Sequence, residues 1–383
     1  MKTLNPKKIL IASSVHVWLD TRIYFKEAIS LAENGFEVVL IARDGADLKE
    51  AVHRNITLVK LPEMRELSRV KACRQIYKLA LDSDAMYYHF HDPELLPVAW
   101  LLKKRKKQTR VIFDMHENFP KALLSKDWIK PPIRKMVVGT VRVLEPRLLA
   151  ACDGVIFAEE SYKKDYPFLR RTVDVYNLPH DPGELAREQG ADLVLTYVGG
   201  ITKIRGAMEM LALVKVLQQR MANVKLQLIG PIAPALKLEM MAYLEEQRLE
   251  RHVCFYDRLS YGEIWTELAK TTVGLCLLHP VPNYMESMPT KFYEYMAAAL
   301  PILSSDIPLW TRFLSENEAG WTADPFDSQT MADDILEVYK AAPSSRLAKM
   351  GWRGRDAFLK KYSWQQEERK LVDFYEAMRV VAE

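Results

Sequence analysis

The feature of this sequence that most constrains its fold is a regular alternation of short apolar segments with amphipathic ones. The apolar segments are rich in β-branched and aromatic residues, which is typical of strands buried on both faces of a parallel sheet. In the first half of the chain these segments are 7–13, 36–42, 56–61, 85–91, 110–116 and 153–159. In the second half they are 192–200, 224–230, 252–257, 273–279 and 300–305.

The segments between these strands have the apolar spacing of helices. The first covers 21–35, where Gly35 is placed to end it. Further helices are expected at 206–221, 235–248, 261–270 and 289–299. This order predicts an α/β fold with two Rossmann-like, doubly wound domains. Because such sheets bind ligands at the carboxyl ends of their strands, we expect the site in a cleft between the domains.

The length of 383 residues fits two domains. We expect an N-terminal domain over 1–177, a linker rich in Pro, Gly and charge over 178–189, and a C-terminal domain over 190–364. The closing helix, at about 365–383, should pack back on the first domain. Its apolar side chains recur at i, i+3, i+4 and i+7 and need a surface to cover. These side chains are Leu371, Phe374, Tyr375 and Met378.

Composition excludes several classes of protein. No apolar run reaches the roughly 18 residues of a membrane span, and the N-terminus becomes polar too early for a signal peptide. The cysteines form no Cys-x-x-Cys pair and no zinc-ligand spacing. We therefore expect four buried free thiols in a cytoplasmic protein. The cysteines are Cys73, Cys152, Cys254 and Cys276.

Charge is distributed unevenly along the chain. Residues 1–171 carry 31 Lys and Arg against 21 Asp and Glu, whereas the remainder has 23 against 29. The surplus gathers in 103–147, where apolar residues and Trp128 interleave with Lys and Arg. Such a surface could contact an anionic membrane, and the alternative is a solvated helix face. Nucleic-acid binding is not expected, because the second half is acidic and no recognition motif is present.

The densest group of polar residues lies in 279–301. Glu286 and Glu294 are separated by seven residues, with Pro289 suited to a first helical turn between them. Glu286 is then expected in a loop and Glu294 about one turn into a helix. The free N–H groups of that first turn would bind a phosphate, and each carboxylate could hold a sugar ring. Alternatively, both acids are ordinary surface residues. The residues of this turn are Met288, Pro289, Thr290 and Lys291.

This segment, ESMPTKFYEYMAAALPI, resembles the E-x7-E region of glycosyltransferase family 4, the retaining enzymes of GT-B fold. Further similar motifs follow the family's order: TYVGGITKIRG at 196–206, EAGWTADPFD at 318–327 and YSWQQEERKLVDFYEAM at 362–378. In the first half, DTRIYFKEAISL, FHDPELLP and FDMHEN are similar to a branch common in bacterial surface-polysaccharide synthesis. The resemblance covers nearly the whole chain.

The resemblance implies roles for residues of the second half. Glu294 would hold the nucleotide ribose, Glu286 would lie near the transferred sugar, and Arg205 would bind the donor diphosphate. Gly199, with Gly200 and Gly206, would allow close approach of the backbone. Many members have an arginine where this chain has Gly200, which leaves one phosphate contact unfilled, and Lys203 could compensate. The alternative for Arg205 is a surface charge before a helix.

In the first half, His116 follows an apolar strand, and the resemblance implies that it contacts the donor sugar. Asp114 or Glu117 could orient its ring. His91 also follows a strand, and the neighbouring Asp92 is well explained as a helix N-cap. A metal site at His89, His91 and His116 is not expected, because we find no neighbouring acidic pair to complete it.

The loop 13–22 replaces a Gly-Gly turn of many family members. His16, Asp20 and Arg22 are polar enough to contact an acceptor or the donor phosphate. The alternative is that Asp20 or Thr21 caps the following helix. No GxGxxG motif is present, which argues against a nicotinamide cofactor.

The sequence thus predicts a metal-independent, retaining glycosyltransferase without a cofactor. It would move a hexosyl group from a nucleotide diphosphate-sugar to a glycan or lipid-linked glycan acceptor. Its basic surface could bind the inner face of the cytoplasmic membrane. Two alternatives stay open. One is a nucleotide-sugar epimerase of the same fold, and the other is a catalytically silent sugar-binding subunit.

Overall fold

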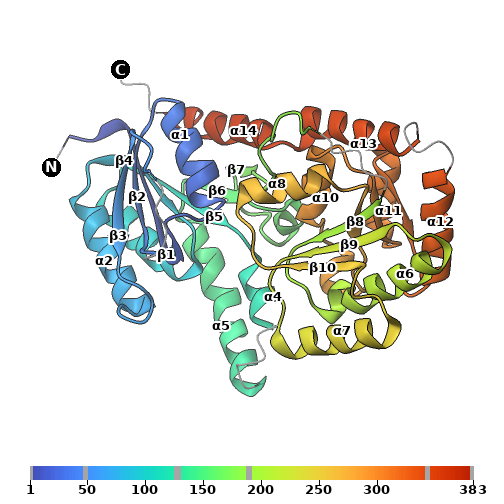
Figure 1. The fold of residues 1–383 in the computed structure, drawn as a ribbon. Coiled ribbons are helices and arrows are strands. Elements are labelled where there is room, and N and C mark those ends of the chain that lie inside the picture. The colour runs from blue at the N-terminus through green and yellow to red at the C-terminus, as the bar shows by residue number, and fades with distance from the viewer. Residues whose placement is uncertain (1–2, 46–50, 125–130, 187–191, 341–345, 380–383) are drawn as a thin grey trace. The chain divides into compact units, whose positions relative to one another are not determined.

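The structure is a computed structural model that describes residues 3–45, 51–124, 131–186, 192–340 and 346–379. By its internal contacts the chain divides into two compact units. The first comprises 1–177 and 364–383, and the second comprises 178–363. Each contains one parallel sheet of Rossmann type (Figure 1), so the predicted α/β fold class is confirmed.

The sheet of the first unit has seven parallel strands in the order β3-β2-β1-β4-β5-β6-β7. Strand β1 lies between β2 and β4, so the order of the strands reverses beside it. The strands are β1 (Asn5–Val17), β2 (Glu37–Arg43), β3 (Ile56–Leu61), β4 (Ala85–Phe90), β5 (Arg110–Met115), β6 (Gly154–Phe157) and β7 (Thr172–Asp174).

The helices of the first unit follow the strands, as a βα alternation requires. The helix expected over 21–35 begins as a π-helical turn, continues as α1 and is followed by Gly35 at φ +85°. The helices are η1 (Ile23–Ala28), α1 (Ile29–Glu33), α2 (Arg69–Asp82), η2 (Pro93–Leu95), α3 (Leu96–Arg105), α4 (Phe119–Leu124), α5 (Pro131–Leu149) and η3 (Glu160–Asp165).

The closing helix α14 (Trp364–Glu376) packs on the first unit, beside α1 (Figure 1). Phe374 fills the space above Gly154 of β6, where a Cβ atom would lie 2.5 Å from its ring. Trp364 donates a hydrogen bond from Nε1 to Ser30 Oγ over 2.9 Å, and the buried Glu367 accepts one from the Tyr176 backbone. The apolar stripe thus covers the first unit's sheet, as its spacing predicted.

The sheet of the second unit has six parallel strands in the order β10-β9-β8-β11-β12-β13, which reverses beside β8. Helices α6 and α7 lie on one side of it and α10 on the other (Figure 1). The strands are β8 (Leu193–Val198), β9 (Val224–Ile229), β10 (Val253–Tyr256), β11 (Val273–Cys276), β12 (Ile302–Ser305) and β13 (Gly320–Ala323). The helices are η4 (Lys203–Arg205), α6 (Ala207–Arg220), α7 (Pro234–Gln247), α8 (Tyr261–Ala269), α9 (Pro282–Met285), α10 (Thr290–Ala297), α11 (Pro308–Glu316), α12 (Ser328–Lys340), α13 (Arg346–Ala357) and η5 (Phe358–Tyr362).

The cysteines differ in burial from what the sequence predicted. The four cysteines are free, but Cys254 is exposed and only Cys276 is fully buried, so the expectation of four buried thiols is wrong. Side chains alternate between the two faces of a strand, and on β10, an edge strand, Val253 is buried whereas Cys254 is exposed. Among the described residues, every helix is too short or too polar to span a bilayer.

Candidate functional site

A pocket of about 300 Å³ lies in the second unit, at the carboxyl ends of β8 and β11. The strand order of the sheet reverses between these two strands, and open α/β sheets bind ligands at that point. The lining residues are Val198, Gly199, Arg205, Leu278, Tyr284, Ser287, Met288, Pro289, Thr290, Lys291, Glu294 and Trp310. The pocket therefore gathers most of the residues that the sequence selected in this half.

Helix α10 is fastened to the sheet beneath this pocket by Tyr295. Its hydroxyl donates toward the backbone oxygens of Thr196 and Leu275, at 3.2 and 3.1 Å, and accepts from the Val198 N–H. The ring lies over Gly274, where a Cβ atom would lie 2.5 Å away. This anchoring fixes the position of Glu294, the preceding residue, in the pocket wall.

The N-terminus of α10 opens on the pocket. The helix begins at Thr290, with Pro289 as a cap residue that offers no side-chain acceptor to the first turn. The preceding loop is held by Trp310, whose Nε1 donates to the Ser287 carbonyl over 2.8 Å. Backbone N–H groups and the positive end of the helix dipole are thus presented at the pocket, an arrangement that favours an anion.

Two cations complete this wall. Arg205 is held by Tyr284 Oη and the Gly200 carbonyl, each 3.3 Å from a guanidinium nitrogen. Lys291 is only 8% exposed and lies with its Nζ 5.1 Å from the centre of the Tyr197 ring. Arg205 is thus half-buried and lines the pocket, and its role at the diphosphate stays a prediction.

The glycines between β8 and α6 are required by close packing. Gly206 has a φ of +81°, and a Cβ atom there would lie 2.0 Å from the Leu277 carbonyl oxygen. Gly199, at the end of β8, has a φ of +130° and lines the pocket. Gly200 brings its carbonyl to Arg205 instead of lining the pocket itself.

Besides Gly200, two predicted residues lie outside this pocket's lining. Lys203 is exposed and forms an ion pair with Glu239 over 2.7 Å, so the suggestion that it replaces the missing arginine is not supported. Glu286 follows the short helix α9 and is exposed. It lies in a loop, as the position of Pro289 indicated, and its role stays a prediction.

The first unit contains a second pocket of about 310 Å³ at the carboxyl ends of β4 and β5. It brings together three of the histidines that the sequence selected. The lining residues are His16, His91, Asp92, Pro93, Phe113, Met115, His116, Glu117, Phe119 and Glu145.

The ring of His116 is oriented from below this pocket. Its Nε2 lies 3.0 Å from Asp114 Oδ2 and 3.1 Å from His91 Nδ1. Asp114 is fully buried, whereas the His116 side chain is 24% exposed. Of the two acids that could orient His116, the structure therefore selects Asp114 over Glu117.

Asp92 occupies the N-cap position of η2, as the sequence suggested, but its side chain does not bond the first turn of that helix. Its carboxylate instead accepts from Ser13 Oγ at 2.8 Å and from the Ser14 N–H, and it lies 3.2 Å from His16 Nδ1. The hydrogen bond to Asp92 raises the pKa of His16 against the opposing effect of burial. The carboxyl end of β1, which extends to Val17 and so includes much of the loop expected at 13–22, is thus tied to the segment after β4, and His16 is held at the pocket.

The other two polar residues selected in the segment 13–22, Asp20 and Arg22, bond to the protein itself. Asp20 accepts from the backbone N–H groups of Arg22 and Ile23, both at 2.9 Å, so it caps the first helix as the alternative proposed. The Arg22 guanidinium is buried and bonds both oxygens of Asp114 at 2.8 and 2.9 Å. From its polarity, Arg22 was expected to contact an acceptor or the donor phosphate. Its buried position beside Asp114 does not agree with that expectation.

Beneath the pocket lies a buried cluster that sequence reasoning did not predict. It contains Glu27, His89, His91 and Asp114, whose ligand atoms lie close enough to hold a metal ion. The expectation that no acidic pair lies near these histidines is therefore wrong. However, Arg22 occupies both oxygens of Asp114 and lies 2.9 Å from Glu27 Oε1, so a cation is already in place.

One cation cannot neutralise two buried carboxylates. Asp114 resists ionisation because it is buried, but the Arg22 charge and the histidine hydrogen bonds outweigh this and hold its pKa well below the usual range. Burial, with the charge of Asp114, raises the pKa of Glu27 well above its usual range. We conclude that Asp114 is the ionised member of the pair and that Glu27 is protonated.

This assignment predicts a pH-dependent effect of the substitution Glu27→Gln. In the unfolded chain Glu27 titrates near 4.5, but the folded protein keeps its proton to higher pH. Above pH 4.5 the wild-type unfolding free energy therefore falls, by up to about 1.4 kcal/mol per pH unit, until the folded-state pKa is reached. Gln does not titrate, so the variant should gain stability relative to wild type between pH 5 and 7.

The measurement is hydrogen exchange by mass spectrometry in increasing urea, following peptides of β4 and β5, at pH 5, 6 and 7. Glu33→Gln, at an exposed position of α1, is the control and should show no such gain. Parallel pH profiles for wild type and Glu27→Gln would show that Glu27 is ionised in the folded protein.

Glu145 is a pocket residue that the sequence did not reveal. It lies in α5, accepts a hydrogen bond from Tyr166 Oη over 2.9 Å, and is 4% exposed. Burial raises its pKa to about 7. The only sequence signal for Glu145 is that it is an acidic residue within a basic stretch. That signal is too weak to identify a site residue.

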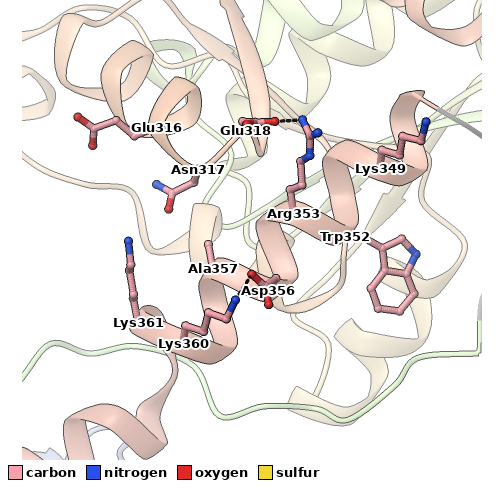
Figure 2. Close-up of a pocket in the computed structure, with 10 residues that line it drawn as sticks. All are labelled: Glu316, Asn317, Glu318, Lys349, Trp352, Arg353, Asp356, Ala357, Lys360 and Lys361. Atoms are coloured by element: carbon pink, nitrogen blue, oxygen red, sulfur yellow. Dashed lines mark hydrogen bonds and ion pairs between the residues drawn. The ribbon is translucent and has the colours of Figure 1, made fainter.

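A larger surface hollow of about 640 Å³ lies in the second unit between the end of α11 and helix α13 (Figure 2). Four of its charged side chains form ion pairs: Arg353 with Glu318, and Lys360 with Asp356 over 2.6 Å. Trp352 points away from Lys360 and Lys361 (Figure 2). The hollow adjoins the amino end of β13, the opposite end from that at which α/β sheets bind ligands.

The basic stretch 103–147 is described only in part, because Lys126, Trp128, Ile129 and Lys130 lie outside the described residues. Within α5, Met136, Val143 and Leu144 are exposed. Contact of this stretch with a membrane stays a prediction.

Comparison with known proteins agrees with this arrangement. Residues 25–167 match the family model described as Glycosyltransferase Family 4, and residues 185–356 match the model described as Glycosyl transferases group 1. No curated protein matches the chain.

Solved structures share the fold at low identity. A glycosyltransferase from Rickettsia africae has a TM-score of 0.71 at 13% identity, with 100% of each chain covered. Sucrose-phosphate synthase from Thermosynechococcus elongatus has a TM-score of 0.69 at 15% identity, covering 97% of this chain and 99% of that one. Anabaena HepE in complex with UDP-glucose has a TM-score of 0.66 at 14% identity, covering 97% and 100%.

At such identities the solved structures show the fold alone, and the two family models supply the family. Both models match in the order that the sequence motifs predicted, one in each unit. The chain therefore belongs to the glycosyltransferases, with a family 4 region followed by a group 1 region in a GT-B fold.

Proposed function

We propose that this enzyme is a retaining, metal-independent hexosyltransferase. It takes a hexosyl group from a nucleotide diphosphate-sugar and transfers it to a hydroxyl of a glycan or lipid-linked glycan, in cytoplasmic synthesis of a cell-surface polysaccharide. The observation that carries the proposal is the pocket of the second unit. There the N-terminus of α10, Arg205 and Lys291 favour a diphosphate, and Glu294 lies one helical turn further along.

The residues act mainly through electrostatics. As the bond between the anomeric carbon and the phosphate oxygen breaks, negative charge develops on the diphosphate, and Arg205, Lys291 and the helix N-terminus stabilise it. Glu294 accepts hydrogen bonds from the ribose hydroxyls. The acceptor oxygen attacks from the face that the phosphate leaves, and the leaving phosphate takes the acceptor's proton. Glu286 then orients the sugar and stabilises positive charge on the anomeric carbon.

The test is incubation with a panel of nucleotide sugars, analysed for free nucleoside diphosphate and for changed sugars. UDP-sugars come first, because the structurally similar HepE was solved with UDP-glucose. Slow release of nucleoside diphosphate from one donor supports a transferase. Inversion at C2 would favour the epimerase, and binding without turnover the silent subunit.

Metal independence makes a separate prediction. Because two cationic side chains and a helix N-terminus already face the diphosphate, turnover of the donor should be unchanged in EDTA. The assay compares initial rates with EDTA, without additions, and with added Mg²⁺ or Mn²⁺. A complete loss in EDTA that Mn²⁺ or Mg²⁺ restores would show that a metal neutralises the phosphates, against the electrostatic account.

A further inference from the structure

The buried cluster of the first unit reaches its pocket at two side chains: His91, which belongs to both, and His116, which contacts Asp114. Arg22 donates from Nε and Nη2 to the two oxygens of Asp114, and from Nη1 to the Val175 carbonyl over 2.8 Å. Two donors therefore meet at Asp114 Oδ2: Arg22 Nε at 2.8 Å and His116 Nε2 at 3.0 Å. An ionised carboxylate has the lone pairs to accept both. His91 Nδ1 lies 3.1 Å from His116 Nε2, so it accepts from that nitrogen when Nε2 carries a proton.

This contact decides which nitrogen of His116 carries the proton. If Nε2 of His116 were unprotonated, it would face an ionised and fully buried carboxylate as a second acceptor over 3.0 Å. The Nε2 atom must therefore carry a proton and donate it to Asp114. In the described part of the chain, Nδ1 of His116 makes no hydrogen bond, and the side chain borders the pocket.

The support beneath Asp114 is rigid and comes from distant parts of the chain. His91 stacks on His89 with ring centres 4.4 Å apart, and His89 Nδ1 lies 2.8 Å from the hydroxyl of Tyr375 in α14. His89, His91 and Tyr375 are all at most 2% exposed. Asp114 is therefore fixed from two sides, by the guanidinium and by a packed stack of rings.

We propose that Asp114, held by Arg22, is a positioning residue that fixes His116 with Nε2 protonated, so that Nδ1 is the acceptor offered to a ligand in the first unit's pocket. The inference deepens the proposed function, because it assumes that this pocket receives the sugar or acceptor. An acceptor nitrogen suits a hydroxyl of a sugar, which can donate to it, and does not suit a phosphate or carboxylate.

The direct test is the ¹⁵N NMR spectrum of the protein with labelled histidine, with His116→Gln used for assignment. We expect the Nδ1 signal of His116 in the range of an unprotonated nitrogen at neutral pH, and Nε2 in the range of a protonated one. The opposite tautomer in the wild-type protein would overturn the proposal. This readout needs no substrate, so it can fail while transferase activity is found, or succeed while no donor is turned over.

Asp114→Asn tests the cause. We expect the His116 signals to shift toward the mixture of tautomers seen in peptides. Glu27 lies 2.9 Å from Arg22 and can ionise in place of Asp114, which should keep this variant folded. Glu27→Gln is the matched control in the same cluster, and it should leave the His116 signals as in wild type. Unchanged signals in Asp114→Asn would contradict the positioning role.

Kinetics give the second arm once a donor is known. Asp114→Asn should lower kcat about tenfold, the effect of losing one charge-assisted hydrogen bond, with the donor KM within about twofold. In a His116→Gln background the same change should cause no further loss, because Asp114 acts only through His116. Additive losses would overturn the proposal. One equivalent of zinc in the purified protein would also overturn it, because a metal on Asp114 would displace the proton of His116.

Discussion

Glu294→Ala is expected to weaken binding of the nucleoside diphosphate by roughly 10–150-fold. A hydrogen bond to a charged acceptor contributes about 1.5–3 kcal/mol, and each 1.4 kcal/mol is a factor of ten in the dissociation constant. Glu294 lines the pocket, and the next residue, Tyr295, ties the helix to three backbone groups of the sheet. The helix backbone that carries Glu294 is therefore fixed before the ligand arrives, and removal of the carboxylate should act on affinity. Isothermal titration with UDP and GDP measures the effect.

The control is Glu245→Ala, which removes an exposed glutamate from α7 in the same unit and should leave affinity unchanged. Glu294→Gln keeps one acceptor oxygen and should lie between wild type and Glu294→Ala. If the affinity of Glu294→Ala for the nucleotide equals that of wild type, Glu294 does not contact it, and the pocket must bind its ligand in another way.

The second unit shows how far local sequence can predict a site. The strand ends, the glycines and the helix start after Pro289 are separate local signals, and the βα order carries all of them to one edge of a sheet. Most of the residues of the pocket wall could therefore be named in advance. Lys203 could not be placed correctly, because its direction depends on Glu239, a neighbour 36 residues away. The two missed strands, β7 and β13, are short and carry little apolar sequence.

The first unit shows where such reasoning ends. Its decisive contact joins Arg22 to Asp114, which are 92 residues apart, and Tyr375 reaches His89 across 286. Nothing in the sequence around Arg22 distinguishes a ligand-binding arginine from one that neutralises a buried carboxylate. Polarity alone suggested that Arg22 binds a ligand. Its burial beside Asp114 shows instead that it neutralises a carboxylate. Glu27 was missed for the same reason, since an acid within an amphipathic helix is normally on the solvent side.

The largest effect on stability is expected for Arg22→Met, which should lower the unfolding free energy of the first unit by about 3–5 kcal/mol. The methionine fills the space of the arginine stem, so the loss reports the charge and not a cavity. Removing one partner of a buried ion pair leaves the other charge uncompensated. Here Asp114 would lose its two guanidinium hydrogen bonds while remaining buried. Urea-dependent hydrogen exchange of β5 measures this unit separately from the other. The surface variant Arg69→Ala breaks an exposed pair with Glu94 and should cost at most about 1 kcal/mol.

The double variant Arg22→Met/Asp114→Asn separates the two ways in which Arg22 could stabilise the fold. If most of the cost of Arg22→Met is the stranded charge of Asp114, replacing that aspartate by a neutral amide of the same shape should restore a large part of the stability, although two side chains have now changed. If Arg22 acts chiefly through packing and its bond to the Val175 carbonyl, the double variant should be no more stable than the single one. The first outcome would mean that the arginine is present to keep Asp114 ionised beneath His116. The second would make the cluster a packing feature, and the orientation of His116 would then need another cause.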